Sequence, residues 1–147
     1  MKTLILTEKP SVAMDFARGL GIRGKHDGYI ENDSYIITWA VGHLVELFEP
    51  QDYNPVWKKW SFENLPIIPS TYKYKPIKRT AKQLNTIRGL LSEKNIGRIV
   101  VATDAGREGE VIARTVLLAA LPGKIKLRID PNANMAYYLG IKAKPKQ

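Results

Sequence analysis

Two short apolar segments, each followed by an acidic loop and then by a helical pattern, most strongly constrain how this chain can fold. Leu4-Ile5-Leu6 and Ile99-Val100-Val101-Ala102 have the length and composition of buried strands in a parallel sheet. Strands therefore alternate with helices along the chain. We predict an α/β fold, a mostly parallel central sheet with helices on both faces, whose ligands lie beyond the carboxyl ends of the strands.

The rest of the hydrophobic pattern supplies the other elements of this fold. The segment 50–76 is rich in proline and aromatic residues, so we expect an irregular excursion there. In the last helix, Val111, Thr115 and Leu118 fall on one side. We expect strands at 4–6, 29–31, 35–40, 99–102 and 127–129, helices at 10–19, 80–93 and 107–121, and a loose basic end at 142–147.

Carboxylates follow both of the apolar strands. Glu8 follows the first, whereas Asp104 and Glu108 follow the later one, with Glu108 in the first turn of the next helix. If the strands are neighbours, these three acids meet at one edge of the sheet, where Mg²⁺ would relieve their repulsion and position a phosphate. In the other interpretation the acids only interact with the helix dipole, and we expect Glu110 to be such a solvated residue.

Two cations flank these acids, and the chain as a whole is basic. Lys9 and Arg107 either contact phosphate or form internal ion pairs with the same carboxylates, and the sequence leaves both open. The net charge of +9 favours a polyanionic partner such as nucleic acid. The absence of cysteine excludes disulfides and thiolate metal sites, and no apolar run has the length of a membrane span.

A second basic region combines cations with aromatic rings between positions 57 and 88. Such interleaving suits single-stranded nucleic acid, so we expect DNA contacts from some of its lysines. The tryptophans are expected in the core. His43 is either a further DNA contact or an ordinary hydrogen-bonding residue. The basic residues are Lys58, Lys59, Lys73, Lys75, Lys78, Arg79, Lys82 and Arg88, and the aromatic ones are Trp57, Trp60, Tyr72 and Tyr74.

Four motifs, in order, closely resemble those of the Toprim domain of type IA DNA topoisomerases of the topoisomerase III kind. The resemblance implies a Toprim fold, which is Rossmann-like. We therefore assign residues 1–122 to a Toprim domain and residues 123–147 to a C-terminal extension, either truncated or the start of another domain. The motifs are Leu6-Thr7-Glu8-Lys9-Pro10-Ser11, Thr38-Trp39-Ala40-Val41-Gly42-His43-Leu44, Leu65-Pro66-Ile67-Ile68-Pro69 and Ala102-Thr103-Asp104-Ala105-Gly106-Arg107-Glu108-Gly109-Glu110.

The resemblance also implies roles for individual residues. Glu8 would be the general acid/base of strand transfer, and Lys9 would help to position the scissile phosphate. Gly106 stands where the family's second aspartate falls, so we expect fewer protein ligands and more water around the metal. The predicted Mg²⁺ ligands are Glu8, Asp104 and Glu108, and the predicted DNA contacts are Lys9, His43 and Arg107.

The activity that the resemblance implies is reversible cleavage and religation of single-stranded DNA. None of the seven tyrosines lies in the family's nucleophile context, so we expect the chain to be inactive alone and to work with the remaining topoisomerase domains of a longer parent. We expect a cytoplasmic, nucleoid-associated monomer that binds single-stranded DNA and no membrane. The alternative is a stand-alone Toprim nuclease or primase-like enzyme that acts through metal-bound water.

Overall fold

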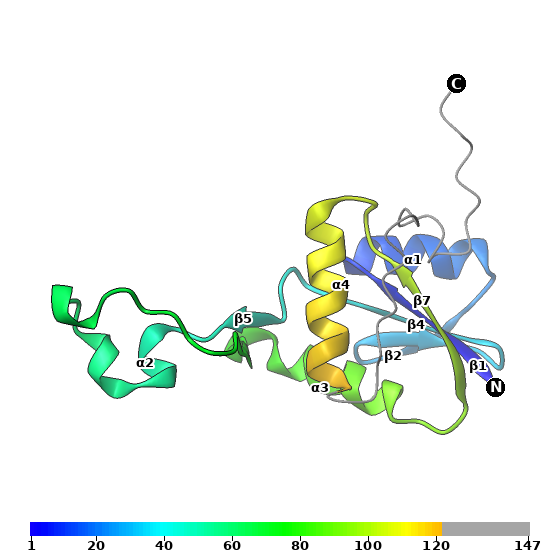
Figure 1. The fold of residues 1–147 in the computed structure, drawn as a ribbon. Coiled ribbons are helices and arrows are strands. Elements are labelled where there is room, and N and C mark those ends of the chain that lie inside the picture. Colours follow the sequence, from blue (N-terminus) through cyan, green and yellow to red (C-terminus); the bar gives the residue numbers. More distant parts are fainter. Residues whose placement is uncertain (122–147) are drawn as a thin grey trace, which may run out of the picture.

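The computed structural model describes residues 1–121, which form a helix-covered sheet and an arm that extends from it (Figure 1). The predicted strand at 127–129 and the extension at 123–147 lie outside the described residues. None of the helices within residues 1–121 is long and apolar enough to cross a membrane.

The elements follow the predicted order closely. The strands are β1 (Lys2–Thr7), β2 (Gly24–His26), β3 (Tyr29–Glu31), β4 (Tyr35–Trp39), β5 (Val45–Leu47), β6 (Tyr74–Pro76) and β7 (Ile96–Ala102). The helices are α1 (Pro10–Gly19), α2 (Pro50–Tyr53), α3 (Ala81–Leu91) and α4 (Arg107–Ala120), with single 3-10 turns at Pro55–Lys58, Phe62–Asn64 and Lys78–Thr80.

The main sheet has five strands in the order β2-β3-β4-β1-β7. β1 is parallel to both of its neighbours, β4 and β7, whereas β2 and β3 add antiparallel strands on one side. The turn between β3 and β4 forms because the Asn32 side chain accepts hydrogen bonds from the Ser34 and Tyr35 N–H groups, at 2.9 and 2.8 Å. The prediction of a mostly parallel α/β sheet is confirmed.

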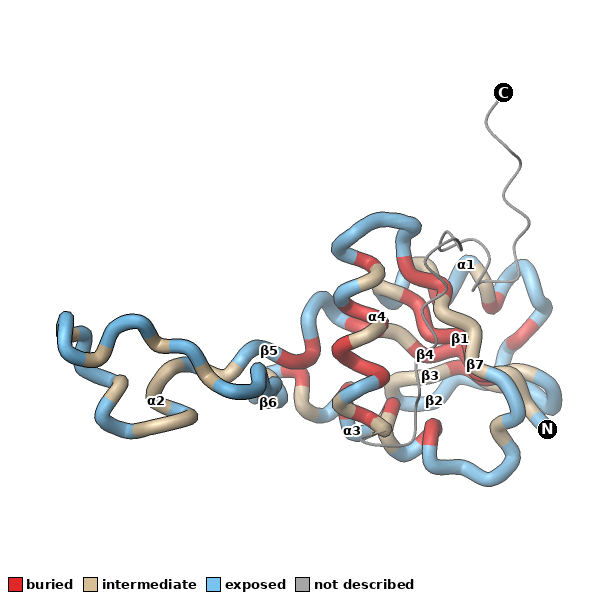
Figure 2. Tube along the Cα trace, viewed as in Figure 1, coloured by how far each residue is buried: buried red, intermediate tan, exposed pale blue. Residues whose placement is uncertain are grey.

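Helices cover both faces of this sheet, and β1 is buried between them. Leu4 and Leu6 belong to the core under α3 and α4, whereas Ile5 belongs to the smaller core under α1. This division follows from the alternation of side chains along a strand. Figure 2 shows the buried residues concentrated where the central strands meet the helices. The prediction of helices on both faces is therefore confirmed.

Strand β7 is less buried than its apolar sequence predicted. Ile99, Val100 and Val101 are half-buried. Within residues 1–121 β7 is an edge strand, with β1 as its neighbour on one side. A β-branched run fits an edge as well as the centre of a sheet, so the composition predicted the strand correctly and its burial wrongly.

Helix α4 buries Thr115 but exposes the other two residues that its pattern placed on the same side. Ile112, Val116 and Leu117 are buried. Val111 and Leu118, which the pattern placed on one side, are 41% and 47% exposed. Apolar residues occur all around this helix, so periodicity alone does not identify the face that packs on the sheet.

Between β4 and α3 the chain forms an arm that extends away from the sheet (Figure 1). Its base is an antiparallel ribbon of β5 and β6, and α2 and two 3-10 turns lie beyond it. The expected irregular excursion is thus partly regular. The prediction that the tryptophans lie in the core is wrong for Trp60, which is 80% exposed. Within residues 1–121, the arm extends away from the sheet and from the helices that cover it (Figure 2).

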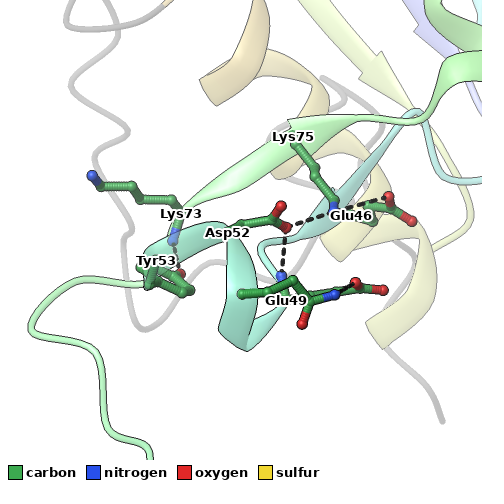
Figure 3. Close-up of polar contacts among 7 residues, drawn as sticks. Glu46, Glu49, Asp52, Tyr53, Lys73 and Lys75 are labelled. Atoms are coloured by element: carbon green, nitrogen blue, oxygen red, sulfur yellow. Dashed lines mark hydrogen bonds and ion pairs between the residues drawn. The ribbon is translucent and has the colours of Figure 1, made fainter. Parts of the chain in front are cut away.

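A cluster of polar contacts holds the base of the arm together (Figure 3). The Lys75 ammonium on β6 lies 2.5 Å from the Asp52 carboxylate on α2 and 3.9 Å from the Glu46 carboxylate on β5. The Tyr53 hydroxyl accepts a hydrogen bond from the Lys73 N–H at 2.8 Å. Lys75 thus contacts both α2 and β5, and these contacts give the arm a defined base.

The contact between Lys75 and Asp52 predicts a pH dependence. The hydrogen bond from Lys75, and then that from the Glu49 N–H, lowers the pKa of Asp52 from its usual 3.8. The Asp52 carboxylate therefore stabilises the arm above its unfolded pKa, and this contribution is lost as the pH falls through the lower folded pKa. We expect NMR titration to give Asp52 a midpoint below 3.8 and to give a higher midpoint in Lys75→Met. Equal midpoints in the two proteins would contradict this assignment.

Candidate functional site

The carboxyl ends of β1 and β7 lie side by side, and this brings their acidic loops together. Thr7 is opposite Ala102 in the parallel register, so Glu8 and Thr103 leave neighbouring strands at the same edge of the sheet. The Glu8 carboxylate accepts a hydrogen bond from the Asp104 N–H at 3.2 Å. The predicted adjacency of the two loops is therefore confirmed.

Thr7 fixes the start of the loop that carries Glu8. Its side chain is buried, and its hydroxyl lies 3.2 Å from the Lys9 carbonyl oxygen and 3.3 Å from the Thr38 carbonyl oxygen. The Thr7 carbonyl in turn accepts a hydrogen bond from the Ala40 N–H at 2.9 Å. The loop is thus tied to β4. This role was not predicted, because a threonine at the end of a strand carries no sequence signal of it.

The first turn of α4 packs directly against the backbone of Asp104. Gly109 is buried, and a Cβ at this position would lie 2.2 Å from the Asp104 carbonyl oxygen and 2.9 Å from its nitrogen. The Gly106 N–H closes the turn by donating to the same carbonyl at 2.8 Å. Gly109 was likewise not predicted to be a positioning residue. Its signal was a glycine inside a helix, where it is less favourable than alanine by about 1 kcal/mol.

The third predicted ligand, Glu108, lies exposed in the first turn of α4. Within residues 1–121, no group of three acidic or histidine side chains is arranged to hold a metal ion. The structure thus brings Glu8 to the Asp104 turn without assembling all three carboxylates into one group. The Glu8 carboxylate contacts the backbone N–H of Asp104. Glu110, expected to be solvated, is half-buried and paired with Arg114.

The predicted DNA contacts are exposed at this edge of the sheet. Lys9 follows Glu8, Arg107 begins α4, and His43 follows β4, which ends beside β1. In the part of the chain that the structure describes, none of the three forms an ion pair with a carboxylate. In the described residues their side chains are therefore accessible to an anionic ligand.

Comparison with known proteins agrees with this geometry. The Toprim domain model matches residues 3–130, a range that includes all of β1 except Lys2, the whole of β7 and both of the loops that follow them. The DNA topoisomerase 3 proteins of Staphylococcus haemolyticus and Bacillus subtilis are each 50% identical to this chain, over 80% and 79% of its length. The chain spans only 16% of the length of either relative. Since the family match includes most of the chain and the sheet has the expected parallel core, this chain belongs to the Toprim domain family.

Proposed function

We propose that this chain is the metal- and DNA-binding domain of a type IA DNA topoisomerase of the topoisomerase III kind. The observation that carries the proposal is the contact between Glu8 and the Asp104 turn, in a chain of the Toprim family. The 50% identity to DNA topoisomerase 3 supports the choice of enzyme. In this role the chain supplies acidic residues for reversible single-strand cleavage and religation, an isomerase reaction that changes DNA topology.

The donor set of the site fits Mg²⁺. Glu8, Asp104 and Glu108 would hold the ion, because carboxylate oxygens are the ligands that it prefers. Thr103, which precedes Asp104, adds a buried hydroxyl without a hydrogen-bond partner among the described residues. When bound, Mg²⁺ would neutralise charge on the scissile phosphate. Gly106 has no side-chain ligand to offer, so we expect water to complete the coordination and the binding to be weak.

The residues around the carboxylates would bind and orient the DNA strand. Lys9 and Arg107 are exposed and form no ion pair with another residue of the described range 1–121, and the Arg107 guanidinium suits bidentate contact with a phosphate. His43 would extend this surface along the carboxyl edge. Glu8 would act as the general acid/base that moves a proton at the leaving oxygen, with its carboxylate oriented by the Asp104 N–H.

Strand passage requires more than this chain supplies. The resemblance to the family assigns the nucleophilic tyrosine to a later domain, and the chain spans 16% of the length of its topoisomerase relatives. We therefore propose that it works inside a longer polypeptide and does not cleave DNA by itself. Its partner would be single-stranded DNA of the nucleoid, bound in the cytoplasm by a monomer.

Calorimetric titration of the purified chain with MgCl₂ tests the metal site. We expect Mg²⁺-dependent heat that is lost in Asp104→Asn, because the amide removes the charge and one oxygen donor. Glu110→Gln is the matched control, since Glu110 is paired with Arg114 and lies outside the proposed ligand set. If Asp104→Asn bound Mg²⁺ as well as the unmodified chain, these carboxylates would have only a structural role.

A further inference from the structure

The tip of the arm, residues 58–65, exposes two aromatic side chains. Trp60 is 80% exposed and Phe62 is 95% exposed, although rings of this size usually bury most of their surface. Together with Ser61 and Leu65 they line a shallow groove of about 190 Å³. Neither ring stacks on another aromatic ring within residues 1–121. Both rings are therefore available to a ligand.

Positively charged residues are neighbours of these rings in the sequence. Lys58 and Lys59 precede Trp60 in the sequence and are exposed. In the described part of the chain neither lysine forms an ion pair, and the neighbouring acid, Glu63, pairs with neither of them. By contrast, the lysine at the base of the arm, Lys75, is already paired. The tip thus combines unpaired cations with accessible rings.

We propose that the tip of the arm binds single-stranded nucleic acid, with bases stacked on Trp60 and Phe62 and phosphates held by Lys58 and Lys59. Stacking on an aromatic ring is open to any base, and the lysines attract the backbone. The inference rests on the proposed function, which brings a single strand to this chain. It adds a contact site that is separate from the carboxylates and does not need the metal.

Nucleic acid fits this tip better than a protein partner does. The core of a protein interface excludes lysine, because an unpaired ammonium loses its hydration there. Phosphates instead neutralise the lysines and release counterions. The aliphatic side chains of Val56 and Ile68 on the same arm are 62% and 71% exposed, but bases do not stack on them. These aliphatic positions therefore provide controls.

The course of the chain links the tip to the candidate site. β4 is parallel to β1, so its end lies at the same edge of the sheet as Glu8. The arm leaves the sheet a few residues later through β5, and His43 lies in the connection (Figure 1). A single strand of nucleic acid held beside the carboxylates can therefore continue past His43 towards the arm.

Fluorescence anisotropy with a labelled oligothymidylate tests the site on the purified chain, in EDTA so that no metal contributes. We expect Trp60→Ala and Phe62→Ala each to weaken binding about tenfold, within the usual effect of losing one base–aromatic stack. Trp60→Phe should recover most of the affinity because it keeps a ring. Ile68→Ala, the aliphatic control, should bind as the unmodified chain does. Replacing Lys58 and Lys59 together with glutamine should make binding less dependent on salt.

An abasic strand of the same length separates stacking from charge. It should bind more weakly than oligothymidylate, and Trp60→Ala should not weaken it further. Equal losses in Trp60→Ala and Ile68→Ala, or no loss in either, would overturn the proposal. Loss of self-association in these variants at unchanged DNA affinity would also overturn it, in favour of a protein partner. The proposed metal site is tested independently by Asp104→Asn, which leaves the tip intact.

Discussion

Gly109→Ala should lower the free energy of unfolding by about 2–3 kcal/mol, the upper part of the usual range for an overpacked core. The added Cβ would lie 2.2 Å from the Asp104 carbonyl oxygen, and neither partner in this clash is the flexible end of a side chain. Helix α4 cannot simply move away, because Ile112 and Val116 anchor it in the core. Urea denaturation followed by circular dichroism measures the loss.

The same substitution in another helix provides the matched control for this result. Gly89 lies exposed within α3, and a Cβ there would meet no atom within 4 Å. Gly89→Ala should therefore stabilise the chain by about 0.5–1 kcal/mol, through the helix preference of alanine alone. If both variants changed stability equally and in the same direction, close contact between α4 and the Asp104 turn would not explain the effect at Gly109.

The Gly109→Ala substitution should also change the geometry of the candidate site. Moving the Asp104 backbone away from α4 alters the N–H group that donates to the Glu8 carboxylate. We therefore expect the Gly109→Ala protein that remains folded to give less Mg²⁺-dependent heat than the Gly89→Ala protein. In this way one buried glycine connects the packing of a helix with the orientation of an acid in the loop after β1.

The sequence predicted the sheet well because its signals are local. Short apolar segments that alternate with helical patterns indicate strands of a parallel sheet, and β1 and β7 indeed pair in parallel. The degree of burial was harder to predict, because it depends on which elements become neighbours. β7 has one neighbouring strand in the described sheet, and α4 turns Val111 to solvent rather than to the core.

The sequence predicted that Glu8 and the Asp104 loop lie together, but it did not predict the residues that hold them in place. Glu8 and Asp104 stand out because a carboxylate after an apolar strand is a local pattern, and their adjacency followed once the strands were paired. Thr7 and Gly109 act through tertiary contacts with backbone atoms, which no sequence pattern shows. The exposed Trp60 was missed for the opposite reason: its size predicted a buried position, and the thin arm provides no core to bury it.

Glu8→Gln should reduce single-strand cleavage by about 10²- to 10⁴-fold in a full-length topoisomerase that carries this domain, the usual effect of removing a general acid/base. The amide keeps the shape of the side chain, and its carbonyl oxygen can still accept the hydrogen bond from the Asp104 N–H. The variant loses the ability to give and take a proton at neutral pH, together with one charged oxygen donor to the proposed Mg²⁺ site. Cleavage of an end-labelled oligonucleotide measures the change.

Two comparisons decide how that result is understood. Glu110→Gln removes a carboxylate from the same edge region but only disturbs an ion pair with Arg114 inside α4, so the full-length enzyme should keep its activity. Full cleavage by Glu8→Gln would refute the acid/base role of Glu8. Metal-dependent cuts by the isolated chain, lost in Glu8→Gln, would instead favour a Toprim nuclease, because hydrolysis by water needs the carboxylates of this edge and no tyrosine from elsewhere.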